Sequence, residues 1–138
     1  MMFMLDTDIC IYTVNRKPPD LRQRFETIEP GMLVMSAITF AELANGAKKS
    51  LQVDRNLRRL QALSELIAVL PFDKAAAIQY GDIRSDLERK GTPIGSNDML
   101  IAAHALSLGL ALVTNNEKEF CRIEGLRIEN WATSSPGA

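Results

Sequence analysis

Five short apolar segments recur along the chain, and most of them are continuous rather than alternating in polarity. Continuous apolar runs of this length are typical of strands covered on both faces, as in a parallel sheet. The predicted strands are residues 3–6, 32–36, 68–72, 110–114 and 126–131. A sheet of this kind needs protein packed above and below it, which favours a layered α/β architecture.

Helical patterns separate the predicted strands. Apolar residues recur at helical spacing in residues 21–28, 57–67 and 76–87, and residues 99–108 are apolar on nearly every side. Asp73 precedes the third pattern and Lys90-Gly91 ends it. The nearly all-apolar segment predicts a buried helix. Strands that alternate with helices predict an α/β fold with right-handed crossovers.

The length of 138 residues indicates one domain, which we place at residues 1–131. A chain of this size supports a core without disulfides or metals, and its apolar content of 46% excludes disorder as the main state. The small and polar residues 132–138 are expected to form a frayed tail.

Composition also bears on the surroundings of the protein. No apolar run approaches the ~20 residues that cross a bilayer, and the N-terminus lacks the basic segment of a signal peptide. Two cysteines make no disulfide framework, so we expect a reducing cytoplasm and no membrane partner. Lys and Arg number 16 and Asp and Glu 17, which excludes a generic basic nucleic-acid coat. An enzyme that handles nucleic acid through a metal remains possible.

Polar and acidic residues gather where the predicted strands end. In open parallel sheets the carboxyl ends of the strands form one edge, where ligands bind. The residues at this edge are Asp6-Thr7-Asp8, Ser36 with Glu42 on the helix that follows, Ser96-Asn97-Asp98, and Thr114-Asn115-Asn116-Glu117 with Glu119.

Several carboxylates need a counter-charge at such a place, because they repel one another and are costly to desolvate. Mg²⁺ or Mn²⁺ supplies that charge through oxygen ligands. No clustered His or Cys favours zinc instead. One or two such ions can activate water and stabilise charge on a phosphate oxygen, which is the chemistry of phosphodiester cleavage.

Four segments carry a family pattern. They are residues 3–8 (FMLDTD), 36–46 (SAITFAELANG), 95–105 (GSNDMLIAAHA) and 113–120 (VTNNEKEF). In this order and spacing, across residues 1–131, they resemble the PIN-domain ribonucleases and more narrowly the VapC toxins of bacterial VapBC toxin–antitoxin pairs. The resemblance implies a three-layer α/β/α domain whose five parallel strands have the order 3-2-1-4-5.

The resemblance also implies a set of site residues. Asp6, Glu42 and Asp98 match the first three acids of the family and are implied to be catalytic metal ligands. Asp8 stands where the family often has Asn, so the charge at the site differs from the usual pattern.

The fourth family position usually reads Thr-x-Asp, whereas this chain reads Thr114-Asn115-Asn116. Asn116 is the expected ligand there, although it carries no charge. Glu119 is the alternative source of the missing carboxylate. Thr114 is expected to position water or substrate.

The family further implies an endoribonuclease that depends on Mg²⁺ or Mn²⁺. It implies a homodimer in the bacterial cytoplasm that a VapB-type antitoxin holds inactive in a larger complex. The substrate is expected to be tRNA or another structured RNA, and relatives of enteric type suggest initiator tRNA.

Each candidate residue also has a purely structural interpretation. Asp6 fits a turn after a strand, and Thr39-Phe40-Ala41-Glu42 fits a capping box. Asp98 is favoured by the dipole of the helix it opens. Residues 114–116 fit a plain turn, and Glu119 fits the solvated start of a helix.

His104 lies six residues after Asp98, a spacing that does not share a helix face. We interpret it as a core histidine with satisfied hydrogen bonds rather than a general base.

Two other functions compete with the ribonuclease. The Asp6-Thr7-Asp8 sequence also fits the Asp-x-Asp of haloacid-dehalogenase phosphatases, in which the first Asp is the nucleophile. That interpretation leaves Glu42 and Asp98 without a role. A PIN-like domain that only binds a partner is the third possibility, and the acids at three of the four family positions speak against it.

Overall fold

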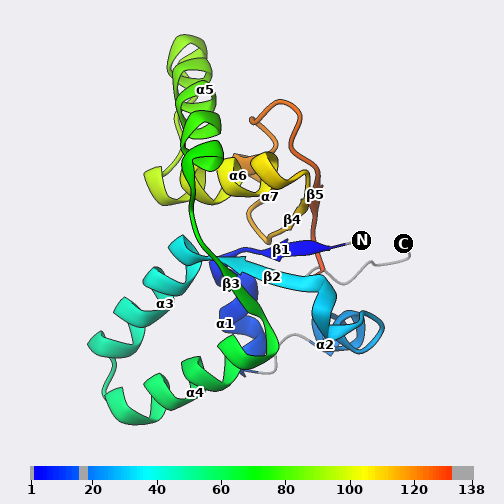
Figure 1. The fold of residues 1–138 in the computed structure, drawn as a ribbon, viewed down its shortest axis with the longest axis vertical. Coiled ribbons are helices and arrows are strands. Elements are labelled where there is room, and N and C mark those ends of the chain that lie inside the picture. The colour runs from blue at the N-terminus through cyan, green and yellow to red at the C-terminus, as the bar shows by residue number, and fades with distance from the viewer. Residues whose placement is uncertain (1, 16–18, 132–138) are drawn as a thin grey trace.

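A five-stranded parallel sheet forms the centre of the computed structural model, which describes residues 2–15 and 19–131 (Figure 1). Its strands are β1 (Phe3–Leu5), β2 (Leu33–Ser36), β3 (Ala68–Leu70), β4 (Ala111–Val113) and β5 (Ile128–Glu129). Their order is β3-β2-β1-β4-β5, and every neighbouring pair is parallel. The predicted sheet and its order are confirmed. The predicted tail at residues 132–138 lies outside the described residues.

All five strands are shorter than the apolar runs that predicted them. Met32 belongs instead to a 3-10 turn, η1 (Pro30–Met32), and the two residues of β5 replace a predicted run of six. The flanking residues still pack into the core, as Trp131 does. Apolar sequence therefore extends beyond the hydrogen-bonded ladder, because burial and strand pairing are separate requirements.

Helices fill the connections between the strands. They are α1 (Thr7–Asn15), α2 (Pro19–Glu26), α3 (Ala37–Lys49), α4 (Val53–Leu66), α5 (Lys74–Lys90), α6 (Ser96–Leu108) and α7 (Glu117–Phe120). The helices predicted near residues 21–28, 57–67, 76–87 and 99–108 are confirmed as α2, α4, α5 and α6. The sequence did not predict α1, whose Ile9 and Cys10 are buried against the sheet. Here tertiary packing outweighs the weak helix propensity of β-branched residues.

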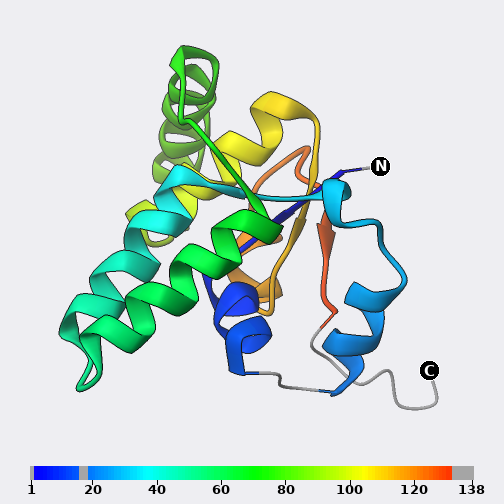
Figure 2. The same ribbon diagram turned by 60° about the horizontal axis from the view of Figure 1, so that its bottom comes forward.

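The sheet separates two layers of helices (Figures 1 and 2). Successive strand residues point to opposite faces. Met4 and Leu112 therefore pack in one core cluster with residues of α5 and α6. Their chain neighbours Leu5 and Val113 pack in a second cluster with residues of α1, α2 and α4. The predicted three-layer α/β/α architecture follows from this alternation.

The ends of α5 and the burial of α6 match the sequence analysis. Asp73 caps α5 by accepting a hydrogen bond from the Ala76 N–H at 3.1 Å, and Gly91 ends the helix at φ 68°. Residues 101–105 of α6 are all buried. Among the described residues, no helix has both the length and the apolar character that crossing a membrane requires.

The central position of α6 predicts a large effect of truncating its core side chains. Ile101 is fully buried, so Ile101→Ala should lower the free energy of unfolding by about 2–5 kcal/mol. The matched control is Ile78→Ala on α5, where the side chain is 57% exposed and the change should stay within about 0.5 kcal/mol. Urea unfolding monitored by the fluorescence of Trp131, the single tryptophan, measures both. Equal losses of unfolding free energy in the two variants would contradict the buried position of Ile101 and the exposed position of Ile78.

Candidate active site

Asp6 lies at the centre of the carboxyl edge of the sheet. It follows β1 directly, and its neighbour across the sheet, Thr114, follows β4; both side chains are buried. The Thr7 N–H donates to Asp6 Oδ1 and the Thr114 hydroxyl donates to Oδ2, each at 2.7 Å. The Asp6 carboxyl is therefore held in one orientation by two neutral donors.

Glu42 approaches the same edge from α3. Its Oε1 accepts a hydrogen bond from the Thr7 hydroxyl, and its Oε2 accepts one from Asn97 Nδ2 at 3.2 Å. Thr7 thus holds Asp6 with its backbone and Glu42 with its side chain. The capping-box interpretation of Glu42 is wrong, because α3 begins two residues before Thr39. Its cap is Ser36, whose hydroxyl accepts from the Ile38 N–H.

Asp98 and Glu119 form a carboxyl–carboxyl pair. Asp98 lies in the first turn of α6, and its side chain shares a hydrogen bond with Glu119 of the short helix α7. Asn116 Nδ2 donates to Glu119 Oε2 at 3.1 Å, and the Asn116 N–H donates to the Thr114 hydroxyl at 2.9 Å. The fourth strand end therefore brings Glu119, rather than an acid at position 116, against Asp98.

Asp8 adds a further carboxylate on the first turn of α1. Its side chain shares a hydrogen bond with Asp6 and accepts one from the backbone N–H of Asn115. Its Oδ1 atom is buried and has no hydrogen-bond partner. A buried carboxylate oxygen without a partner is unfavourable, so this position is suited to a cation.

The pKa values of Asp6 and Asp98 are both shifted upward. Burial, followed by the charge of Asp8, raises the pKa of Asp6 to about 7, despite hydrogen bonds from Thr114 and Thr7 that lower it. Burial and then the hydrogen bond and charge of Glu119 raise the pKa of Asp98 to about 7. The described ion pairs lie on α5 and between α2 and β5, away from these carboxylates. No described ion pair therefore offsets the repulsion among these acids, which is consistent with the raised pKa values of Asp6 and Asp98.

These residues fit a hard divalent cation in donor type and in charge, because the donors are oxygens and the site is anionic with an unpaired buried oxygen. Within the described ranges, however, no three His, Cys, Asp or Glu side chains are close enough together to hold one ion. The two carboxyl pairs, Asp6–Asp8 and Asp98–Glu119, act on one another through their charges, because Asp98 raises the pKa of Asp6 and Asp8 raises that of Asp98. A bound cation would favour the ionised forms of these acids.

Sequence reasoning identified most, but not all, of this arrangement. Asp6 contacts Thr114, and Glu119 contacts both Asp98 and Asn116, so these residues meet at the edge that the strand-end argument indicated. It placed Thr7 and Asn97 at this edge but assigned no role to the Thr7 hydroxyl or the Asn97 amide, which hold Glu42. Both residues lie beside a predicted acid in the chain, and that position was the only available signal.

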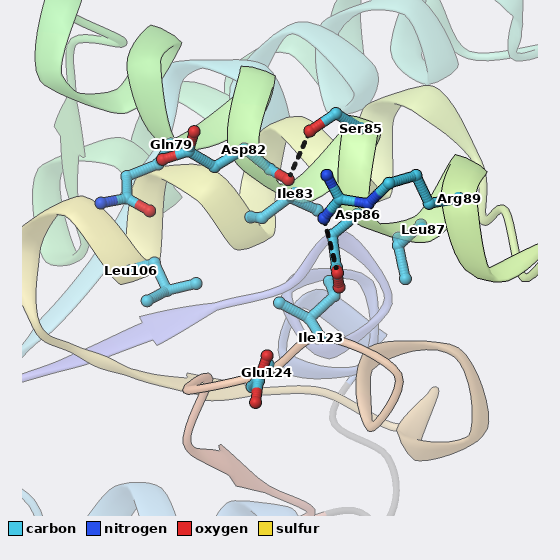
Figure 3. Close-up of a pocket in the computed structure, with 10 residues that line it drawn as sticks. All are labelled: Gln79, Asp82, Ile83, Ser85, Asp86, Leu87, Arg89, Leu106, Ile123 and Glu124. Atoms are coloured by element: carbon cyan, nitrogen blue, oxygen red, sulfur yellow. Dashed lines mark hydrogen bonds and ion pairs between the residues drawn. The ribbon is translucent and has the colours of Figure 1, made fainter.

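A separate cavity of about 380 Å³ lies away from these acids, between α5, α6 and residues 123–124 (Figure 3). Some of its polar groups are paired with one another: Arg89 contacts Asp86 at 3.2 Å, and the Ser85 hydroxyl donates to the Asp82 carbonyl. No predicted site residue lines it. The chemistry-bearing groups are therefore at the edge of the sheet and not in this cavity.

Comparison with known proteins agrees with the fold. The PIN domain family matches residues 3–126. Over 131 residues the chain is 48% identical to a protein of Salmonella typhimurium named tRNA(fMet)-specific endonuclease VapC, covering 95% of this chain and 98% of the relative. A Shigella flexneri protein of the same name is 46% identical over 132 residues, covering 96% and 99%. The crystal structure of DNA-bound VapBC from Salmonella typhimurium contains a chain with a TM-score of 0.90 and 48% identity, covering 95% and 98%.

The raised pKa values predict an unusual dependence of stability on pH. Between the ordinary pKa of 3.8 and the folded value of about 7, the folded state holds more protons on Asp6 and Asp98 than the unfolded state does. The free energy of unfolding that these two acids contribute is therefore fully present at low pH. It decreases as the pH rises from the ordinary pKa through the folded value of about 7. In chelator, Asp98→Asn should remove part of this decline.

Thermal unfolding of the parent and of Asp98→Asn from pH 5 to pH 8, with chelator and with Mn²⁺, measures this effect. The difference between the two proteins reports Asp98 together with the neighbouring acids that its charge perturbs, Asp6 among them. Mn²⁺ should stabilise the parent most at high pH, where its ligands are ionised. An identical pH profile in both proteins would contradict the assigned pKa shift.

Proposed function

This chain belongs to the PIN-domain family, and from that premise we propose that it is an endoribonuclease, the toxin of a type II toxin–antitoxin pair. The observation that carries the proposal is the group of ionisable carboxyls at the carboxyl edge of the sheet, Asp6 with Asp8 and Asp98 with Glu119. It occurs in a chain that is 48% identical, over nearly its whole length, to a named tRNA endonuclease.

We propose that Asp6, Glu42, Asp98 and Glu119 hold Mg²⁺ or Mn²⁺. A bound ion of this kind lowers the pKa of water and stabilises negative charge on a phosphate oxygen. The chain's own residues supply orientation. Thr7 and Thr114 fix Asp6, and Thr7 with Asn97 fixes Glu42, so that carboxylate oxygens face the edge of the sheet before any ion arrives.

Glu119 is the better candidate for the fourth acid than Asn116. The Asn116 amide nitrogen is directed toward Glu119, which leaves Asn116 as the residue that positions Glu119. Glu119 in turn contacts Asp98. Asn116 remains able to offer its amide oxygen. Thr114 is fully buried and its hydroxyl donates to Asp6, so the role that we propose for it is to orient Asp6.

The substrate that we propose is tRNA, with initiator tRNA as the specific target. Support comes from the two relatives named tRNA(fMet)-specific endonuclease, at 48% and 46% identity. The net charge of −1 means that contacts with RNA phosphates must come from local groups of basic residues rather than from the protein as a whole.

The partner that we propose is a VapB-type antitoxin, because a solved VapBC complex contains a chain with a TM-score of 0.90 to this one. We also propose a homodimer that assembles with antitoxin into a larger complex in the bacterial cytoplasm. Cys10 and Cys121 are both free, as expected in a reducing compartment.

The competing functions lack comparable support. Both oxygens of Asp6 accept hydrogen bonds, an arrangement that orients a ligand and restrains a nucleophile. A phosphatase would also leave the contacts of Glu42 and Asp98 without a purpose. A silent binding module would not require the uncompensated charge that the site contains.

Replacement of the central acid tests the proposal. Asp6→Asn keeps the shape of the side chain but removes its charge, so metal-dependent cleavage of tRNA should fall at least about 100-fold while the fold is retained. Asp82→Asn, the same change on the exposed face of α5, is the matched control and should leave the rate unchanged. Cleavage by the purified chain with Mg²⁺, with Mn²⁺ and with chelator gives the comparison. Full activity of Asp6→Asn would refute the proposal.

A second pair of variants distinguishes the fourth acid. Glu119→Gln should weaken Mn²⁺ binding about ten-fold or more and slow cleavage in parallel. Glu117→Gln, two residues earlier on α7, should change neither quantity, because its described contact is with Asn130. Calorimetric titration of Mn²⁺ together with the cleavage assay measures both. If Glu119→Gln binds Mn²⁺ and cleaves RNA as the parent does, while Asn116→Ala loses both, then Asn116 is the ligand.

A further inference from the structure

His104 is the one histidine of the chain, and it is buried in the middle of α6. Its Nδ1 lies 2.8 Å from the Ser36 hydroxyl oxygen, and its ring also hydrogen-bonds the backbone of Pro71. Proline has no N–H, so the Pro71 carbonyl must accept a hydrogen bond from the ring. The tautomer that satisfies both contacts carries its hydrogen on Nε2 and accepts the Ser36 proton at Nδ1. The expectation of a satisfied core histidine is confirmed.

The ring joins three segments of the chain. Ser36 is the last residue of β2 and the cap of α3, and its hydroxyl also accepts from the Ile38 N–H at 3.1 Å. Pro71 follows β3, and the neighbouring Phe72 ring packs edge-on against His104 at 5.5 Å between centroids. One side chain on α6 thus fixes both the start of α3 and the segment that leads into α5.

Two of the proposed metal ligands lie on the helices that this ring connects. Glu42 is on α3, six residues after Ser36, and Asp98 is on α6, six residues before His104. At the edge of the sheet these helices are linked again by the hydrogen bond between Asn97 and Glu42. That second link involves an exposed amide, which water competes for, whereas the His104–Ser36 bond is fully buried.

We propose that His104, acting through Ser36, is a positioning residue that sets where Glu42 stands relative to Asp98. The inference rests on the proposed function, because it concerns the ligands assigned there. His104 touches neither the metal nor the RNA. It holds α3 in register with α6 so that carboxylates on two separate helices reach one ion.

Two substitutions separate the two hydrogen bonds of the ring. His104→Asn places an amide oxygen near the position of Nδ1 and keeps an acceptor for Ser36. His104→Gln places an amide nitrogen near the position of Nε2 and keeps a donor for Pro71 while losing the acceptor for Ser36. Because both variants lose the ring and its contact with Phe72, their common loss of stability reports packing. Their difference reports the link to Ser36.

The experiment measures Mn²⁺ affinity by calorimetry, kcat and KM for tRNA cleavage, and the melting temperature of each folded variant. His104→Gln should lose roughly ten-fold in Mn²⁺ affinity, a size typical of groups that orient metal ligands, and should lower kcat with little change in KM. His104→Asn should stay within about three-fold of the parent. In the background of Ser36→Ala, the difference between the Asn and Gln variants should vanish.

Equal Mn²⁺ affinity in folded His104→Asn and His104→Gln would overturn the proposal, and so would a loss that follows melting temperature alone. The metal readout also separates this inference from the proposed function. If the parent binds Mn²⁺ but cleaves no RNA, the ribonuclease assignment fails, and the difference between the two variants in affinity still decides the role of His104. If the parent binds no Mn²⁺, both fail.

Discussion

Repulsion among carboxylates at one edge of the sheet is the constraint on which the rest of the site depends. The parallel sheet brings the ends of β1 and β4 together. Four acids therefore lie close enough to affect one another's pKa values: Asp6, Asp8, Asp98 and Glu119. Burial raises the pKa of Asp6 and Asp98 to about 7, so these acids hold protons to a higher pH than exposed carboxyls do. A bound cation would favour their ionised forms and lower both pKa values.

Neutral hydrogen-bond donors fix the orientation of the carboxyl groups. Thr7, Thr114 and Asn97 orient Asp6 and Glu42 through hydrogen bonds without cancelling their charge. An arginine or lysine in these places would stabilise the carboxylates but would compete with a metal for them. The use of hydroxyl and amide groups therefore keeps the acids both ordered and available. The buried His104–Ser36 bond extends the same principle from side chains to whole helices.

The strand order and the roles of Glu42 and Asp98 came from the family resemblance rather than from apolar periodicity. From periodicity and strand ends, the sequence predicted the alternation of strands and helices and placed Asp6 and Thr114 at strand ends that meet. It could not predict α1, since Ile9 and Cys10 form a helix only when packed against the sheet. It misplaced the cap of α3 because Thr39 and Ser36 are both plausible caps, and only the end of β2 decides between them. The contacts of Thr7 and Asn97 with Glu42 span 35 and 55 residues, which no local pattern reveals.

The most direct test of a metal site at this edge is the anomalous scattering of Mn²⁺ in crystals of the protein. We expect a peak between Asp6 and Asp98, with Glu42 and Glu119 turned toward it and the Asp98–Glu119 hydrogen bond broken. The peak should disappear in Asp6→Asn crystals. Absence of a peak at this edge at saturating Mn²⁺, in crystals whose carboxyls keep the present hydrogen bonds, would contradict a metal site here.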